Sequence, residues 1–237
     1  MAATLNVLCA GAVQGLVDAM RERFEHDHGI VLSTRFGAVG AMRDALRGGA
    51  PCDVLIVSEA MIDALLASGE VRSGSEAPLG RVETALAVVR GAKVPKVAGA
   101  QALKAALLRA SALYFPDATL STAGAHVAST LDRLGIGTSL APRLRMFANG
   151  RTAMRALVDA ADPDALGCTQ ASEIVATPGV VLIGALPAPF ALATVYSAAV
   201  ATVAASEELG RRFIALLAGE ESLAQRRAAG FDEMAAS

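Results

Sequence analysis

Hydrophobic runs alternate with amphipathic stretches along most of the chain, a pattern typical of strands that alternate with helices. The first part predicts strands at residues 4–9, 31–36 and 53–57 and helices at 14–28, 42–47 and 59–67. Residues 72–80 are rich in Ser, Gly and Pro and predict a loop, and residues 81–90 predict a long strand. This order favours parallel sheets that present ligands at the carboxyl ends of their strands.

The same rhythm resumes near residue 101. It predicts strands at 112–115, 144–147, 166–170 and 180–183, helices at 101–109, 125–134, 152–160 and 172–175, a second long strand at 193–203, and closing helices at 207–217 and 221–229. The two long strands predict an α/β protein of two Rossmann-like lobes joined by two crossover strands. Residues 1–82 with 198–237 would form one lobe and residues 83–197 the other, and a cleft between such lobes is a natural small-molecule site.

Small residues stand where the first two strands give way to helices. Residues 10–12 read Ala-Gly-Ala and residues 37–40 read Gly-Ala-Val-Gly, so no bulky side chain would keep a ligand from the backbone. The first N–H groups of a helix have no internal partner, and the helix dipole favours negative charge there. We therefore expect an anion to be bound by Ala10, Gly11, Ala12, Ala38, Val39 and Gly40. The alternative is that the glycines serve only tight turns.

Further candidate contacts lie in the predicted second lobe and at its entry. They are Arg81, Ser121, Thr122, Gly124, His126, Asn149, Gly150 and Gln170. Ser121 and Asn149 could equally be helix N-caps, and Arg81 could form a salt bridge between the lobes. His126 could bind a carboxylate, act as a general base, or be structural.

Gln170 and two further positions, Arg151 and Glu173, carry polar side chains that suit particular roles. The amide of Gln170 can donate and accept, which suits a carboxylate or a hydroxyl. Arg151 could pair with a carboxylate or point to solvent. Glu173 is a weaker candidate for a base, because an acidic residue there more often caps the short helix or faces solvent.

Composition narrows the function classes. The 237 residues are 54% hydrophobic but only 4% aromatic, which suits Ala-, Val- and Leu-rich helices layered on a parallel sheet. A net charge of −2 argues against nucleic-acid and membrane-surface partners. The longest apolar runs are far shorter than the roughly 20 residues of a membrane span. We expect a monomer with no nucleic-acid partner and no membrane insertion.

The sequence contains no pattern for a metal or a cofactor. Cys9, Cys52 and Cys168 are far apart and read as small buried hydrophobic residues, although Cys9 ends a strand beside the first small-residue turn. His26 and His28 do not share a helix face. Phosphate-binding loops, nucleophile elbows and zinc-protease motifs are absent from the sequence.

The residues at the start leave localisation open. Met1-Ala2-Ala3 leads directly into the first strand, with no charged or apolar leader before it. Either the protein is cytoplasmic, or a leader has been removed and the mature protein is periplasmic.

Several stretches together resemble a known family. They are residues 5–12, 36–40 with 48–56, 79–81 and 165–170. The layout resembles the type II periplasmic-binding-protein fold, and within it the molybdate-binding-protein-like solute receptors of ABC transporters. The resemblance implies a small anionic ligand and a transporter permease as partner.

The departures from that group change the expected ligand. Molybdate receptors of this group typically carry serines after the first two strands and a tyrosine near residue 170, whereas this chain has Ala10-Gly11, Ala38-Val39-Gly40 and Gln170. A tetrahedral oxyanion needs many short hydrogen bonds to replace its hydration, so a di- or tricarboxylate fits better than molybdate.

The chain also resembles the aconitate isomerase branch of this fold, which lacks the oxyanion serines. Two functions stay open. One is a solute-binding protein for an organic anion. The other is a cofactor-independent isomerase of an unsaturated tricarboxylate, in which His126 would remove an allylic proton and return it elsewhere.

Overall fold

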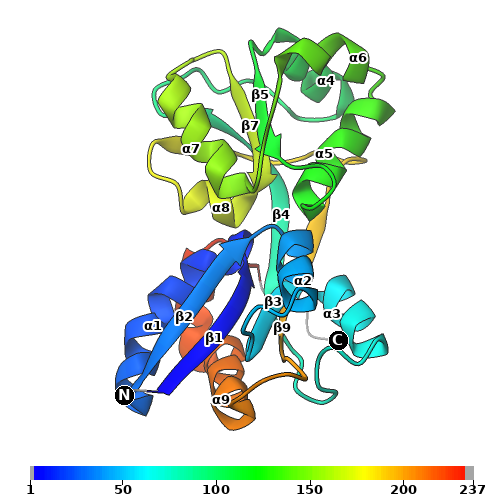
Figure 1. The fold of residues 1–237 in the computed structure, drawn as a ribbon. Coiled ribbons are helices and arrows are strands. Elements are labelled where there is room, and N and C mark those ends of the chain that lie inside the picture. Colours follow the sequence, from blue (N-terminus) through cyan, green and yellow to red (C-terminus); the bar gives the residue numbers. More distant parts are fainter. Residues whose placement is uncertain (1–2, 233–237) are drawn as a thin grey trace. The chain divides into compact units, whose positions relative to one another are not determined.

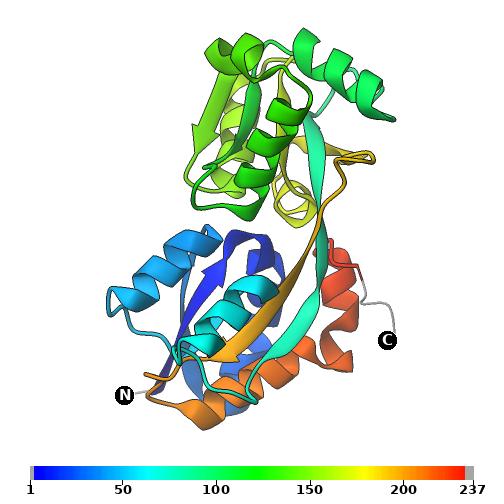
Figure 2. The same ribbon diagram turned by 90° about the vertical axis from the view of Figure 1, so that its right-hand side faces the viewer.

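The structure is a computed structural model that describes residues 3–232 (Figure 1). It divides into two compact units. Unit 1 contains the residues up to Arg81 together with those from Thr194 onward, and unit 2 contains Val82–Ala193. The chain passes from one unit to the other in two long strands, β4 (Ala77–Val89) and β9 (Ala193–Val200), which Figure 2 shows. The sequence pattern predicts these crossing points at residues 82 and 197.

Unit 1 is built on a mainly parallel sheet. Its strands are β1 (Ala3–Ala10), β2 (Ile30–Gly37), β3 (Val54–Ser58) and β9, in the order β2-β1-β3-β9. The first three strands are parallel and β9 is antiparallel to β3. The chain moves from β1 outward to β2 and then back across β1 to β3. Right-handed crossovers in opposite directions place their helices on opposite faces of the sheet.

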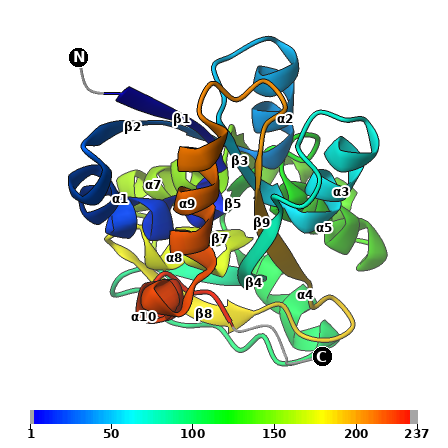
Figure 3. The ribbon, with the colours of Figure 1, turned by 90° about the horizontal axis from the view of Figure 1, so that it is seen from below.

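The helices of unit 1 follow from that rule. They are α1 (Gln14–His28), α2 (Val39–Arg47), α3 (Glu59–Ala67), α9 (Glu207–Ala218) and α10 (Leu223–Ala228), with short 3-10 turns at Gly11–Val13 and Glu220–Ser222. Helix α9 packs beside α1, as Figures 1 and 3 show, and the buried rings of Phe24 and Phe213 meet there with centroids 4.8 Å apart. One part of the core of unit 1 therefore lies between the sheet and these two helices, and the buried side chains of α2 and α3 form another.

Unit 2 repeats the same plan. Its strands are the second part of β4, β5 (Leu113–Pro116), β6 (Leu144–Phe147), β7 (Leu166–Gln170) and β8 (Val180–Ala185), in the order β4-β7-β5-β6 with β8 on the other side of β4. Its helices are α4 (Ala100–Arg109), α5 (Thr122–Arg133), α6 (Gly137–Leu140), α7 (Gly150–Ala160) and α8 (Ala171–Val175), with a 3-10 turn at Ala141–Arg143.

Alternation along the strands assigns each side chain of this sheet to one of two cores. Leu86 of β4 and Cys168 of β7 join the core that contains Leu131 of α5. Ala85 of β4 joins the core that contains Met154 of α7. Because strand side chains alternate, Gln170 lies on the face of α5, and Thr169 lies on the face of α7.

The structure confirms the α/β class and the two-unit plan, and it corrects several element boundaries. Helices expected to begin at residues 42, 125 and 152 begin at Val39, Thr122 and Gly150. Strand β4 starts at Ala77, inside the stretch predicted as loop, and β9 ends at Val200 instead of residue 203. The short helix α6 was not predicted.

A common cause explains the late helix starts. The first turns carry small and polar residues that do not show the helical hydrophobic period, so the sequence pattern becomes visible only one turn later. Within residues 3–232, no helix combines the length and the apolar composition needed to cross a lipid bilayer.

Candidate functional site

The parallel strands of unit 1 end side by side at one edge of the sheet. Ala10 at the end of β1 pairs with Gly37 at the end of β2, and Cys9 pairs with Ile56 of β3. A 3-10 turn or a helix begins directly after each strand, at Gly11, Val39 and Glu59. Two of the predicted backbone turns and a third helix start therefore lie at a single edge.

The predicted residues at this edge have no side chains with which to cap their helices. The N-cap residues are Ala10 and Ala38, and neither makes a side-chain cap. The first hydrogen bond within α2 runs from Met42 N–H to the carbonyl O of Ala38, at 3.0 Å. The earlier amides, at Val39 and Gly40, have no acceptor within the helix by its geometry. They are the kind of donors that an external anion can use.

The third helix start at this edge carries a polar side chain, that of Ser58, which the sequence pattern did not single out. Ser58 ends β3 and is the N-cap residue of α3, yet its hydroxyl makes no cap hydrogen bond. It is only 8% exposed and pairs with Tyr196 of β9. The signal was present in the sequence, because Ser58 stands between a hydrophobic strand and a helix just as Ala10 and Ala38 do.

Arg81 is the cation of unit 1 that the sequence singled out. Its backbone exchanges hydrogen bonds with Asp232, and its Nε is buried without a hydrogen-bond partner in the described part of the chain. Among residues 3–232 the guanidinium forms no ion pair. The expected salt bridge is therefore not seen there, and the charge of Arg81 is not neutralised by a described carboxylate.

In unit 2, the start of α5 is capped by a neutral hydroxyl. The Oγ of Ser121 accepts from Gly124 N–H at 3.3 Å. A Cβ at Gly124 would lie 2.2 Å from the carbonyl O of Asp117, so this helix start requires glycine for its close approach to the preceding loop. Asp117 accepts the N–H groups of Thr119 and Leu120 and the hydroxyl of Thr119. These hydrogen bonds lower the pKa of Asp117.

His126 lies one turn further along α5, beyond the free amides of the helix start. Its Nε2 is 2.7 Å from the carbonyl O of Phe190. A carbonyl can only accept, so Nε2 carries the proton in this contact, and Nδ1 is the basic nitrogen of the neutral ring. The guanidinium of Arg133 stacks on the Phe190 ring, 4.7 Å from its centroid. The hydrogen bond to the Phe190 carbonyl gives His126 a structural role and leaves its Nδ1 for any proton transfer.

The start of α7 is built differently, because an internal carboxylate occupies it. Asn149 caps the helix as predicted, and its Oδ1 accepts from Thr152 N–H at 2.9 Å. The Glu173 carboxylate, only 5% exposed, accepts the backbone N–H groups of Gly150, Arg151 and Gln170. Thr169 Oγ1 donates to the same carboxylate at 2.5 Å. The backbone N–H of Gly150, a predicted ligand contact, is thus already used inside the protein.

Gly150 is required by this arrangement. A Cβ there would lie 1.9 Å from Thr169 Oγ1 and 2.0 Å from Glu173 Oε2. Burial raises the pKa of Glu173, and its hydrogen bonds with Thr169 and the backbone oppose the shift. From the sequence, Glu173 is expected to cap its own short helix or face solvent, but its carboxylate caps α7 instead.

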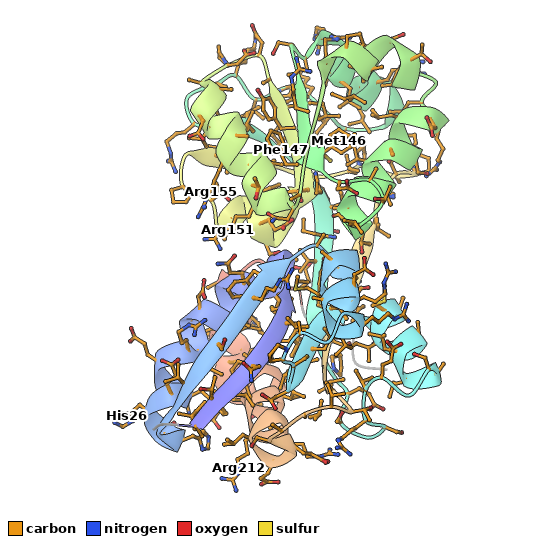
Figure 4. All side chains as sticks on the ribbon, viewed as in Figure 1. His26, Met146, Phe147, Arg151, Arg155 and Arg212 are labelled. Atoms are coloured by element: carbon orange, nitrogen blue, oxygen red, sulfur yellow. The ribbon has the colours of Figure 1, made fainter. Side chains whose placement is uncertain are left out.

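Arg151 follows Gly150 and extends from α7 beside α8 (Figure 4). Its Nη2 donates weakly, at 3.4 Å, to the carbonyl O of Ala176. Its Nε is buried and has no partner among the described residues. Arg151 forms no ion pair within residues 3–232. A contact with a ligand carboxylate and an orientation toward solvent both stay predictions.

Gln170 is 2% exposed at the end of β7, on the face of α5. Thr84 of β4 pairs with it in the sheet and is 0% exposed. The Oγ1 of Thr84 and the Oγ of Ser172 have no hydrogen-bond partner within the described residues. Sequence reasoning missed Thr84, because it stands inside a hydrophobic run that signals only a strand.

The cysteines are buried and free, as expected. Cys9 donates its thiol hydrogen to the carbonyl O of Ala10, and burial, followed by the charge of Asp18, raises its pKa well above the ordinary value. Burial raises the pKa of Cys52 and of Cys168 to about 12. Neutral thiols are poor nucleophiles and poor metal ligands. The described residues contain no group of three or more potential metal ligands among His, Cys, Asp and Glu.

Comparison with known proteins identifies the family. The sequence model for bacterial extracellular solute-binding proteins matches residues 5–232. The chain belongs to this family. It is also 28% identical over 227 residues to an aconitate isomerase of a Pseudomonas species, covering 92% of this chain and 84% of that protein.

Solved structures agree on the fold. The periplasmic molybdate-binding protein of Azotobacter vinelandii superposes with a TM-score of 0.78 at 18% identity, covering 98% of this chain and 100% of that one. The sulfate-binding protein SubI of Mycobacterium tuberculosis gives 0.75 at 18% identity, covering 98% and 87%. PEB3 bound to L-phospholactate gives 0.67 at 15% identity, covering 97% and 100%. At these identities the likeness establishes the periplasmic-binding-protein fold alone.

Proposed function

We propose that this solute-binding protein takes a small organic anion, a di- or tricarboxylate in preference to molybdate, and that it delivers the ligand to an ABC-transporter permease. The observation that carries the proposal is the pair of helix starts in unit 1 that are capped by Ala10 and Ala38 instead of by hydroxyl side chains. The backbone amides at these helix starts can hold a carboxylate. The side chains of Ala10 and Ala38 offer no additional hydrogen-bond donor.

The choice between carboxylate and oxometallate rests on desolvation. A compact tetrahedral dianion must exchange its whole hydration shell for hydrogen bonds in a small space. A tricarboxylate spreads its charges over several atoms, so separate donors can serve them. Arg81, whose guanidinium has no carboxylate partner among residues 3–232, is such a donor in unit 1.

The relatives are consistent with an anionic ligand, since the names of the three structures cited above include molybdate, sulfate and L-phospholactate. A transporter role places the protein in the periplasm. An enzymatic role would be compatible with the cytoplasm as well.

The direct test is a thermal-shift screen with molybdate, citrate, cis-aconitate and trans-aconitate. We expect the melting temperature to rise with one of the tricarboxylates, because a ligand that binds only the folded state stabilises it. Replacing Arg81 with Gln should reduce that rise. A large shift with molybdate and none with any carboxylate would refute the proposed ligand class.

A second candidate function is favoured by the similarity to aconitate isomerase across 92% of the chain. In this reading the ligand is an unsaturated tricarboxylate. Nδ1 of His126 would take a proton from an allylic carbon as the double bond shifts, and it would return that proton to the far carbon of the allylic system. No net oxidation or reduction is involved, and no cofactor is needed.

Proton NMR separates the two candidates. Incubating the protein with cis- or trans-aconitate in deuterated buffer would give interconversion if the protein is an isomerase, with deuterium in the product only where the proton on Nδ1 exchanges with solvent before its return. Replacing His126 with Gln should then abolish turnover while citrate still raises the melting temperature. Unchanged turnover in that variant would exclude His126 as the base, and absence of turnover in the parent protein would leave binding as its function.

A further inference from the structure

A cavity of about 440 Å³ lies in unit 2, away from the helix starts described above. It is formed by the loop that follows β4, by the end of α4 and by the segment that leads into β7. Strand β7 begins here, at Leu166, and Gln170 marks its opposite end. The cavity is thus at the amino end of β7, and the candidate contacts are at its carboxyl end.

The floor of this cavity is apolar and its rim is cationic. Val88, Ala106 and Leu166 line the interior, while Lys93, Lys96 and Arg109 stand around it as exposed side chains. Asp164 is the only acidic residue of the lining, so the charged rim carries a net charge of +2. Pockets for small molecules combine an apolar lining with a few placed polar groups in this way.

The three cations have no partners of their own. Within residues 3–232, none of them forms an ion pair or a side-chain hydrogen bond. The third lysine of the chain, Lys104, donates instead to the carbonyl O of Leu134 at 2.8 Å. Val94, between the two rim lysines, is 52% exposed and extends the apolar surface.

Unit 2 as a whole is basic. It carries ten Lys and Arg against seven Asp and Glu, a net charge of +3, while unit 1 carries eleven against sixteen, a net charge of −5. All three lysines of the chain are in unit 2. The ion pairs among the described residues all lie in unit 1. A net field of this sign concentrates anions at a cationic cavity.

We propose that this cavity is a second binding site, which takes an organic phosphate with an apolar body. A phosphate monoester carries a charge of about −1.5 to −2 near neutral pH, which matches the rim, and the apolar body would cover the floor. Lys93, Lys96 and Arg109 hold the phosphate. Val94 and Leu166 contact the apolar part.

The lysine content of the chain makes the site testable with pyridoxal 5′-phosphate, an aromatic phosphate that carries an aldehyde. The aldehyde carbon condenses with a lysine Nζ to form an imine and release water. Sodium borohydride then delivers hydride to the imine carbon, the nitrogen takes a proton from solvent, and a stable secondary amine remains. Peptide mass spectrometry reads the fraction modified at each of the three lysines.

We expect Lys93 or Lys96 to be modified about tenfold more than Lys104, because the cationic cavity concentrates the phosphate. Pyridoxal without phosphate should lose that preference, and phenyl phosphate should protect the site. Replacing Arg109 with Gln should weaken the preference several-fold. The matched control is Arg155→Gln, which removes an exposed arginine of α7 that likewise lacks a described partner (Figure 4).

The results of these labelling experiments support or overturn the proposed phosphate site. Equal labelling by pyridoxal and its phosphate, or no protection by phenyl phosphate, would overturn the proposal. Protection by an acidic peptide but not by phenyl phosphate would also overturn it and would point to a protein partner. Citrate and aconitate shifts of the Arg109→Gln variant should equal those of the parent, so a failure here is distinguishable from a failure of the proposed function.

Discussion

Two helices of unit 2 start in opposite ways. Helix α5 begins behind Ser121, whose neutral hydroxyl satisfies one backbone amide. Helix α7 begins behind Asn149 and receives, in addition, the buried carboxylate of Glu173. Both starts have the same positive end of a helix dipole. The start of α7 is already neutralised by the protein itself, whereas the start of α5 can still take a negative charge from outside.

This difference shows which helix starts can serve as ligand sites. The sequence alone leaves two interpretations of a small-residue turn at a helix start, an open anion site or simply a tight turn. The structure shows that such a turn can equally be small because an internal side chain fills the space, as Thr169 and Glu173 do beside Gly150. A small residue at a helix start is therefore evidence of close approach, and the identity of the approaching group must come from the fold.

The largest expected effects come from adding a methyl group at each start. In Gly124→Ala, the new Cβ meets backbone carbonyls at 2.2 and 2.4 Å, and neither can move away without moving the loop. In Gly150→Ala, the new Cβ meets side-chain atoms of Thr169 and Glu173. Each variant should lower the free energy of unfolding by about 3 kcal/mol. Urea denaturation would measure both.

A second substitution distinguishes the two cases. Adding Thr169→Ala to Gly150→Ala removes one of the colliding atoms and should recover part of the lost stability. No side-chain truncation can do this for Gly124→Ala, because its obstacle is the backbone of Pro116 and Asp117. If Asp117→Ala restored stability to Gly124→Ala as fully as Thr169→Ala restores it to Gly150→Ala, the backbone of Pro116 and Asp117 would not be the obstacle at Gly124.

The next effect concerns the internal carboxylate. Glu173→Gln keeps the shape of the side chain but replaces one acceptor oxygen with an amide that cannot accept. Donors of the α7 start are then left unsatisfied in a buried place, which should cost about 2 kcal/mol of stability. Glu208→Gln is the matched control, because Glu208 is exposed and, among residues 3–232, pairs only with Arg212 along one helix face. Its measured cost should stay under about 0.5 kcal/mol.

Much of this contrast could be predicted from the sequence, and one part could not. The order of strands and helices, the cap at Asn149 and the hydroxyl at Ser121 all follow from local patterns. The role of Glu173 does not, since its carboxylate reaches the start of a helix that lies 23 positions earlier in the chain. Only the packing of α7 against α8 and β7 brings those groups together.

Ligand binding at the open start can be tested by deleting a single N–H. Proline is tolerated at the first position of a helix, and Ser121 already has the extended ψ of 132° that a residue before proline needs. Thr122→Pro should therefore leave α5 intact while removing one donor. We expect about a tenfold loss of affinity for the responding tricarboxylate, measured by calorimetry.

A matched proline controls for the change in the chain itself. Ala100→Pro places the same residue at the first position of α4, after Gly99. Its affinity should equal that of the parent protein. If both prolines weakened binding equally, or if neither did, the start of α5 would not be a ligand contact.

Removing the cap side chains should have smaller effects. Ser121→Ala and Asn149→Ala each delete one cap acceptor, and each should cost about 1 kcal/mol. The two variants should differ in their response to anions. Sulfate should offset part of the loss in Ser121→Ala, because it can approach the open start, and should do little for Asn149→Ala, where Glu173 remains in place. A thermal-shift titration with sodium sulfate, using sodium chloride at equal ionic strength as control, would show this difference.

The smallest expected effect is the pH dependence of the filled start. Burial raises the pKa of Glu173 above that of an unfolded glutamate, so ionising this group is harder in the folded chain. The folded state then binds more protons than the unfolded state between the two pKa values, and stability falls as pH rises through that window. Glu173→Gln cannot titrate, so the stability advantage of the parent over the variant should shrink from pH 4 upward. Denaturation midpoints compared at several pH values would test this, and an advantage that grows with pH would mean that the four hydrogen bonds to the carboxylate outweigh its burial.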